Sequence, residues 1–186
     1  MARDLTKEKV VANAVELANE CGDVHRLKLK DLAAKLNIKV PSLYNHVKGM
    51  DGLIYALRLY AVKTIDEQLR DSIAGQTGRS ALMSAARSYR AFAHSNHGIY
   101  PLILPAATAD SEPEIEKISW NTVSLILLIL GSFGLEGDEA LHTVRGFRSL
   151  LHGFVSLELS GGFGLELDLD ESFERLMTTF IDGFHP

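Results

Sequence analysis

Apolar residues recur along the chain at the three- and four-residue spacing of a helix face, and this periodicity predicts an all-α fold. The first helix is expected to begin after Thr6, a suitable N-cap, and to end at Gly22. Its buried stripe consists of Val10, Ala14, Leu17 and Ala18. No segment shows the alternation of apolar and polar residues that is typical of a half-buried strand.

The same pattern predicts about nine helical elements in total. After the first they are expected at residues 28–35, 40–47, 51–74, 78–95, 113–130, 138–160 and 170–184, with a short irregular element between Pro101 and Pro105. The run 123–130 is almost wholly apolar, which is typical of a helix buried on all sides. Asp168, followed three residues later by Glu171, is expected to cap the last helix.

The second and third helices are close enough in sequence to form a helix-turn-helix. Their apolar faces, which would pack together, are Leu32, Ala33 and Leu36 on one helix and Leu43 and Val47 on the next. Asn37 is expected to adopt the left-handed backbone conformation of a sharp turn. Pro41 suits the first turn of the following helix, where its missing N–H costs little.

The third helix is too polar to be simple core, and its outer face indicates contact with DNA. Tyr44 and His46 are expected to contact phosphates, although the ring of Tyr44 could instead pack against the first helix. The candidates for reading base edges are Val40, Pro41, Ser42 and Asn45. The expected Coulombic partners of the DNA backbone are Lys28, Lys30, Lys39 and Lys48.

Charge is divided unevenly between the two parts of the chain. The net charge of −5 over 186 residues combines +3 for residues 1–50 with −8 for residues 51–186. A basic first part attracts phosphates while the acidic remainder repels them. We therefore expect a helix-turn-helix DNA-binding domain over residues 1–48 and a larger helical bundle over residues 49–186, linked by the long helix from residue 51.

Three sequence features predict a cytoplasmic protein with no membrane partner. The single Cys21 excludes an intrachain disulfide and fits a reducing compartment. The N-terminus has no long apolar run of the signal-peptide kind. The longest apolar run, residues 125–130, is far shorter than the roughly 20 residues that span a bilayer.

The run Leu43-Tyr44-x-His46-Val47-Lys48, preceded by Ala33-x-x-Leu36-x-Ile38, resembles the TetR family of bacterial repressors. Trp120 with His152-Gly153, and Tyr89 and Phe92 with Gly98 and Tyr100, resemble the subgroup whose regulatory domain is named for a Trp and a His-Gly pair. The resemblance implies a homodimer on a palindromic operator. It also implies that residues 49–186 form a ligand-binding and dimerisation domain, with a small-molecule effector in a cavity of the C-terminal bundle. Half-sites roughly 34–36 Å apart would be required.

Lys39 and Val40 depart from the family's usual Ser or Thr cap, so a side-chain cap of the recognition helix is expected to be missing.

Aromatic residues of the second domain are the candidates for lining an effector pocket: Tyr89, Phe92, Tyr100, Trp120 and Phe147. Core packing explains each of them equally well. His94 and His97 are poorly placed for a metal site, because a helix is expected to end between them. No catalytic motif and no cofactor motif appears, so we expect no enzyme, no cofactor and no metal.

The last two helices carry more apolar residues than one core needs, which predicts a four-helix dimer interface. These residues are Leu141, Val144, Leu151, Val155, Phe173, Leu176 and Phe180. The sequence therefore predicts a ligand-responsive repressor. Two alternatives stay open: a DNA-binding protein whose solid bundle only dimerises, and a helical enzyme or interaction module that has lost DNA binding.

Overall fold

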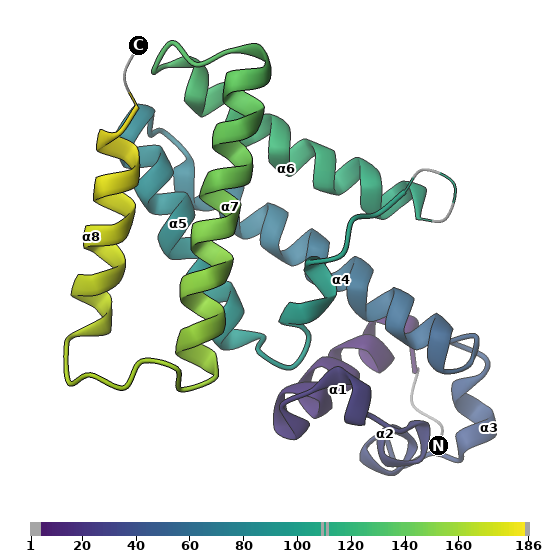
Figure 1. The fold of residues 1–186 in the computed structure, drawn as a ribbon. Coiled ribbons are helices and arrows are strands. Elements are labelled where there is room, and N and C mark those ends of the chain that lie inside the picture. Colours follow the sequence, from purple (N-terminus) through teal and green to yellow (C-terminus); the bar gives the residue numbers. More distant parts are fainter. Residues whose placement is uncertain (1–4, 109, 111, 185–186) are drawn as a thin grey trace. The chain divides into compact units, whose positions relative to one another are not determined.

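The computed structural model describes residues 5–108, 110 and 112–184, and this part of the chain is all-helical, as predicted. The α-helices are α1 (Lys7–Cys21), α2 (Leu29–Lys35), α3 (Val40–Leu43), α4 (Gly49–Ile73), α5 (Gly78–Ser95), α6 (Pro113–Gly131), α7 (Gly137–Leu159) and α8 (Leu169–Asp182). Two 3₁₀ turns, η1 (Val24–Arg26) and η2 (Tyr100–Ile103), complete the order (Figure 1). The irregular element expected between Pro101 and Pro105 is thus mainly η2.

Local capping explains where several helices begin and end. The N–H of Lys9 donates to the Thr6 hydroxyl at 3.3 Å, and Gly22 ends α1 with a φ of 71°. The N–H of Glu171 donates to the Asp168 carboxylate at 2.8 Å at the start of α8. These caps confirm the predicted ends, because each satisfies backbone groups that a helix terminus leaves without partners.

The chain forms two compact units. Unit 1 comprises Met1–Thr64 and Ser95–Glu116, and unit 2 comprises Ile65–His94 and Lys117–Pro186. The backbone therefore passes between the units within α4, within α5 and within α6. The expected functional boundary at residue 48 stays a prediction.

In unit 1, α1 packs against η1 and α2, and α2 packs against α3. These three helices are called the head below. Its core contains side chains with no exposed surface, including Val10, Leu32 and Leu43. Lys35 on α2 contacts Glu20 at 2.7 Å and Glu16 at 3.3 Å on α1, and its hydrogen bond to Glu20 raises the pKa of the amine.

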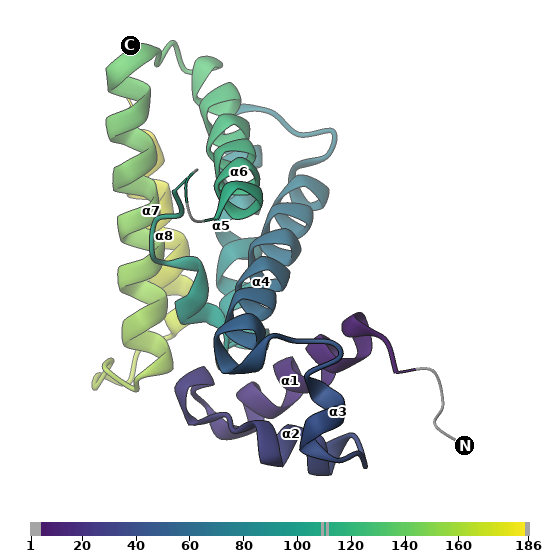
Figure 2. The ribbon, with the colours of Figure 1, turned by 90° about the vertical axis from the view of Figure 1, so that its right-hand side faces the viewer.

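In unit 2, α7 and α8 lie side by side and antiparallel, joined by the connection 160–168 (Figures 1 and 2). The N-terminal parts of α7 and α8 are each acidic, with Asp138 and Glu139 in one and Asp170 and Glu171 in the other, which suits the positive end of a helix dipole. Phe173, Met177 and Val155 are buried at 0–1% exposure and form part of the core between the helices.

This burial corrects part of the predicted dimer surface. Leu151, Val155 and Phe173 are at most 3% exposed within their own unit, so they have no surface left for a second subunit, and the prediction is wrong for them. Leu141 is 38% exposed, and Val144, Leu176 and Phe180 are half-buried. The periodic pattern alone could not separate the two groups, because both fall on apolar helix positions.

Arg90 on α5 joins α5, α7 and the start of α8. Its guanidinium lies 5.0 Å from the ring centre of Phe173 and 5.7 Å from that of Phe154, within range of a cation–π interaction. The same group forms a two-pronged ion pair with Glu158 and contacts Asp170 at 2.7 Å. Glu158 is only 8% exposed and also contacts Nε2 of His94 at 2.9 Å. Hydrogen bonding from Arg90 lowers the pKa of Glu158.

Glu158→Gln is expected to lower the free energy of unfolding by about 2 kcal/mol at pH 7, because a half-satisfied Arg90 stays among aromatic rings. In the unaltered protein, the lowered native pKa stabilises the fold fully above the unfolded value of about 4.3, and this contribution fades as the pH falls further. The difference in the free energy of unfolding between the unaltered protein and Glu158→Gln should therefore become smaller below about pH 4.3. Urea titrations at several pH values measure both effects. The exposed Glu166→Gln is the control, and an equal loss in both variants would contradict the assignment.

Candidate nucleic-acid interface

The turn between α2 and α3 has the predicted geometry. Asn37 has a φ of 54° and is the one non-glycine residue with positive φ in the described part of the chain. The N–H of Ile38 donates to the carbonyl of Ala33 at 3.0 Å, across the end of α2. This backbone conformation reverses the chain tightly enough to bring Leu43 of α3 against the core of the head.

The start of α3 lacks a side-chain cap, as expected. Lys39 stands at the N-cap with extended backbone, and no side chain there accepts a hydrogen bond from the helix. Pro41 lies in the first turn, where its missing N–H removes a donor that a helix start leaves unsatisfied in any case.

Regular α3 is shorter than predicted. It was expected to run through Val47, but the α-helix ends at Leu43 and residues 44–46 form turns. The N–H groups of Asn45 and His46 donate to carbonyls three residues earlier, at 3.4 and 2.9 Å. These tighter turns continue the helical path without the regular α-helical bonding, so the recognition segment is best defined as Val40–Lys48.

The recognition segment has a buried apolar side, formed by Leu43 and Val47, and a largely exposed opposite side. Leu43 and Val47 are 0% and 4% exposed, whereas Tyr44 is 57% exposed. The high exposure of Tyr44 contradicts the alternative in which its ring packs against α1. The remaining predicted DNA-contact residues are exposed at Lys28, Lys30, Lys39, Pro41, Asn45 and Lys48, and half-buried at Val40, Ser42 and His46.

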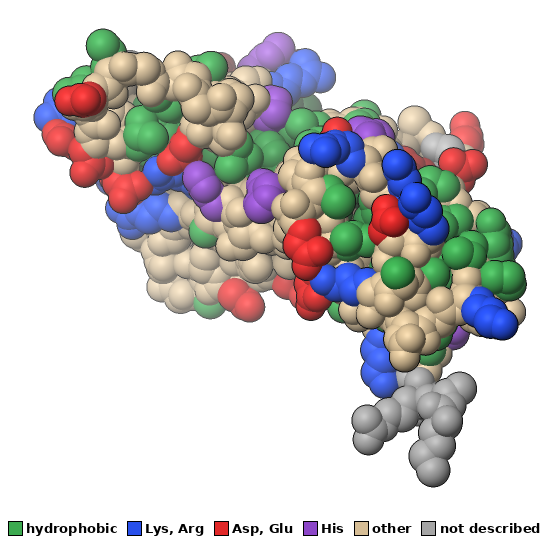
Figure 3. Space-filling model, turned by 90° about the horizontal axis from the view of Figure 1, so that it is seen from below, with side chains coloured by type: hydrophobic (Ala, Val, Ile, Leu, Met, Phe, Trp, Pro, Cys, Tyr) green, Lys and Arg blue, Asp and Glu red, His purple; other side chains and the backbone are tan. Residues whose placement is uncertain are grey.

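Figure 3 shows Lys and Arg side chains spread over the surface of the head. Lys35 differs from the predicted contact lysines because it is held by Glu16 and Glu20. The ion pairs of Lys35 fix α2 against α1 and thereby help to orient the turn that carries the recognition segment. The sequence carried no clear signal for this role, because the partners lie 15 and 19 residues away.

The predicted effector residues do not share one environment. Tyr89, Phe92 and Phe147 are buried in unit 2, at 1–7% exposure. Tyr100 is buried in unit 1, and Trp120 on α6 is 59% exposed. The buried residues contribute to packing, and their contact with an effector stays a prediction.

His94 contacts Glu158 and His97 contacts the carbonyl of Asn19, and the described residues contain no group of three side chains suited to hold a metal ion.

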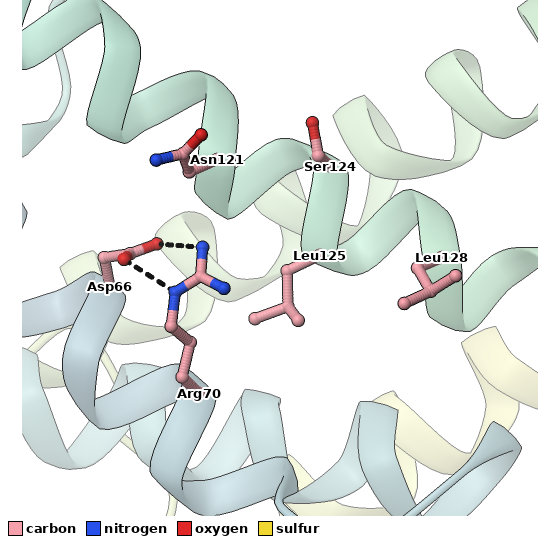
Figure 4. A pocket seen from close by; sticks show the side chains of 6 residues that line it. All are labelled: Asp66, Arg70, Asn121, Ser124, Leu125 and Leu128. Carbon is pink, nitrogen blue, oxygen red and sulfur yellow. Dashed lines mark hydrogen bonds and ion pairs between the residues drawn. The ribbon is translucent and has the colours of Figure 1, made fainter.

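An open pocket of about 470 Å³ lies within unit 2 between α4 and α6 (Figure 4). Its lining residues are Asp66, Arg70, Asn121, Ser124, Leu125 and Leu128. Asp66 is held by Arg70 at 2.8 Å and by the Thr122 hydroxyl at 2.7 Å. The sequence analysis missed this pocket. The four-residue spacing of Asp66 and Arg70 was a readable signal for the ion pair, but nothing local pointed to α6 as the opposite wall.

Comparison with known proteins agrees with this geometry. The family described as "Tetracyclin repressor-like, C-terminal domain" matches residues 82–180. YobS, an HTH-type transcriptional regulator of Bacillus subtilis, is 35% identical over 180 residues, which cover 96% of this chain and 92% of YobS. The chain belongs to the TetR family. It is a helix-turn-helix transcriptional regulator and not an enzyme.

Other members support the same assignment. An HTH-type regulator of Mycobacterium tuberculosis is 30% identical over 179 residues, covering 96% of this chain and 81% of the relative. A TetR variant from Acinetobacter baumannii, solved in complex with minocycline, shares the fold with a TM-score of 0.73 at 24% identity, over 97% of each chain. The matching C-terminal family is not the Trp/His-Gly subgroup, which is therefore not established. No helix in the described ranges has the length and apolar character needed to cross a membrane.

Asn37→Ala is expected to lower the free energy of unfolding by about 1 kcal/mol, because alanine tolerates the left-handed conformation less well than asparagine. Asn37→Gly should keep or slightly raise stability, since glycine adopts this conformation freely. Urea unfolding measures both. Asn45→Ala, an exposed asparagine with negative φ in the same segment, is the control and should change stability by less than about 0.5 kcal/mol. Equal losses for Ala and Gly at residue 37 would contradict the turn assignment.

Proposed function

We propose that this regulator is a ligand-responsive repressor that binds a palindromic operator as a homodimer. The observation that carries the proposal is the recognition segment Val40–Lys48, which follows a tight left-handed turn and exposes polar side chains outward. A helix buried in the core would not expose Tyr44 at 57% beside the exposed Asn45 and Lys48. A helix with such an outer face suits the major groove of duplex DNA.

The contacts divide by chemistry. Tyr44 and His46 hold the phosphate backbone and so fix the position of the segment on the duplex. Base edges are met by Val40, Pro41, Ser42 and Asn45, where Asn45 can pair with adenine and the apolar residues can touch a thymine methyl group. The long-range attraction comes from Lys28, Lys30, Lys39 and Lys48. This division predicts that the lysines set the salt dependence of binding while the base-edge residues set its sequence preference.

A second subunit docks on α7 and α8 in this proposal. Leu141 is 38% exposed and lies one helical turn from the half-buried Val144 on α7, and the half-buried Leu176 and Phe180 lie on α8. Burying such a surface against its own copy forms a four-helix interface with twofold symmetry, which matches the symmetry of a palindromic operator.

The effector is proposed to be a small molecule bound in unit 2. The minocycline complex of the Acinetobacter baumannii relative, which shares this fold, supports a ligand-binding role, without naming the ligand for this chain. The predicted contacts Tyr89, Phe92, Trp120 and Phe147 belong to unit 2, as does the pocket between α4 and α6. Assignment to the Trp/His-Gly subgroup stays a prediction, and a cytoplasmic location follows from the proposed role.

Tyr44→Ala and His46→Ala are each expected to weaken operator binding about tenfold, because each removes a phosphate contact. Lys48→Ala should weaken binding to all sequences and reduce the slope of log affinity against log salt by about 1. Fluorescence anisotropy with duplexes from the neighbouring intergenic DNA measures these values. Lys117→Ala on α6, an exposed lysine of unit 2, is the control and should bind as the unaltered protein does. Unchanged binding in both Tyr44→Ala and His46→Ala would refute the phosphate assignments.

Leu141→Asp is expected to weaken dimerisation at least roughly tenfold, because it places a charge at a desolvated surface. Sedimentation equilibrium over a range of concentrations measures the monomer–dimer constant. Leu128→Asp on α6 is the matched control: Leu128 is even more exposed, at 77%, but lies outside α7 and α8. Dissociation caused by Leu128→Asp and not by Leu141→Asp would assign the interface to another face.

A further inference from the structure

The pocket between α4 and α6 has an apolar wall. Leu125 and Leu128 of α6 form this wall, and the Leu125 side chain points from α6 toward Arg70 on α4 (Figure 4). Leu128 is 77% exposed, although the next two residues of the helix, Ile129 and Leu130, are buried. A bound molecule with an apolar body would remove the Leu128 side chain from water, which is favourable.

The other end of the pocket is polar, and its hydrogen bonds use both oxygens of the Asp66 carboxylate. Oδ2 accepts from Nε of Arg70 at 2.8 Å, and Oδ1 accepts from Nη2 of the same residue at 3.2 Å. The Thr122 hydroxyl donates to Oδ1 at 2.7 Å. The Asp66 side chain is also only 13% exposed. This carboxylate therefore has little capacity left to bind a cationic ligand.

Arg70 keeps donors that its ion pair does not use. Within the described part of the chain its Nη1 forms no hydrogen bond, and this nitrogen lies on the side of the guanidinium that faces Leu125 (Figure 4). Asn121 on the opposite wall is exposed and carries a further amide donor. A guanidinium has donors and no acceptor, so a ligand at this end of the pocket must supply acceptor oxygens.

Charge decides which kind of oxygen fits. Of the lining residues, only Asp66 and Arg70 are ionisable, and their formal charges cancel. A carboxylate ligand would be attracted by Arg70 and repelled by Asp66, and an ammonium ligand would meet the reverse arrangement. Either ligand would also lose hydration on entering the pocket. An uncharged carbonyl or hydroxyl oxygen can accept a hydrogen bond from Arg70 at a much smaller cost.

We propose that the pocket between α4 and α6 binds an uncharged small molecule with an apolar body and a carbonyl or hydroxyl oxygen at one end. The oxygen accepts from Arg70, and the apolar body lies along Leu125 and Leu128. The volume of about 470 Å³ is typical of a small-molecule site. None of the buried aromatic residues predicted to contact an effector lines this pocket. The inference names the class of ligand, and it rests on the proposed function for the role of that ligand as an effector.

Three probes with the same ten-carbon chain and different end groups test the class of ligand: decan-2-one, decanoate and decylammonium. Each is titrated into the full-length protein without DNA, and isothermal titration calorimetry measures the dissociation constant. Fluorescence of Trp120, the single tryptophan of the chain and the neighbour of Asn121 on α6, reports binding beside the pocket. Decan-2-one is expected to bind with a dissociation constant on the order of 100 μM, and both charged probes at least about tenfold more weakly.

Asp66→Asn separates the charge argument from simple hydrophobic binding. Asparagine can still accept from Thr122 and Arg70, but the charge of Arg70 is no longer compensated. Decanoate should therefore bind this variant at least about tenfold more tightly than it binds the unaltered protein. Glu67→Gln is the matched control, because it removes an exposed charge next to Asp66 that does not line the pocket, and it should change the affinity for decanoate less than about twofold. An equal gain in both variants would overturn the role of the ion pair.

Leu125→Ala tests the apolar wall and should weaken the binding of decan-2-one about fivefold. Leu157→Ala, which alters an exposed leucine of α7 outside the pocket, should leave this binding within about twofold of the original. Equal affinity for the three probes, or no saturable binding of decan-2-one, would overturn the inference. Failure of the unaltered protein to bind any palindromic duplex would overturn the proposed function instead, and the titrations would still decide the class of ligand because they contain no DNA.

Discussion

The close backbone contact between Gly98 and the end of α1 is the constraint on which unit 1 depends. The contact leaves no room for a side chain at Gly98. The Asn19 side chain also accepts a hydrogen bond from the N–H of Gly98 and donates one to the carbonyl of Ser95, so residues 95–98 have one arrangement on the head. Further along, Arg58 of α4 bonds the carbonyl of Pro105 at 2.6 Å and pairs with Glu112, and Lys63 pairs with Glu114 at 2.6 Å. The segment Ser95–Glu116 is thus bonded near both of its ends to the rest of unit 1.

Unit 2 is organised by a different kind of contact. Arg90 uses its flat face against Phe154 and Phe173 and its edge against Glu158 and Asp170, so one side chain fixes α5, α7 and α8 together. Arginine is suited to this because its guanidinium is planar, permanently charged and weakly hydrated. These polar contacts within a largely apolar core give the bundle one defined packing.

Local signals in the sequence predicted the local features of the fold. The caps at Thr6 and Asp168, the left-handed turn at Asn37 and the missing cap at Lys39 all depend on residues within a few positions of each other. The features that could not be predicted depend on distant partners. The burial of Leu151, the pairing of Lys35 with Glu20 and the bond between Asn19 and Gly98 arise from tertiary contacts that no periodicity encodes. For the same reason, the sequence predicted the exposed polar residues of the recognition segment better than it predicted the residues that line the pocket of unit 2.

The composition of α4 has a mechanical consequence. The helix contains 25 residues, which corresponds to a rod of about 37 Å, and it carries no proline. Its two glycines, Gly49 and Gly52, both fall in the first turn, directly after the recognition segment. Flexure is easiest where side chains are smallest and the backbone is least restricted, so α4 is least stiff at the end nearest the recognition segment. The recognition segment is therefore joined to α4 at the point where this helix bends most easily, so small changes in its orientation need no change in the rest of the helix.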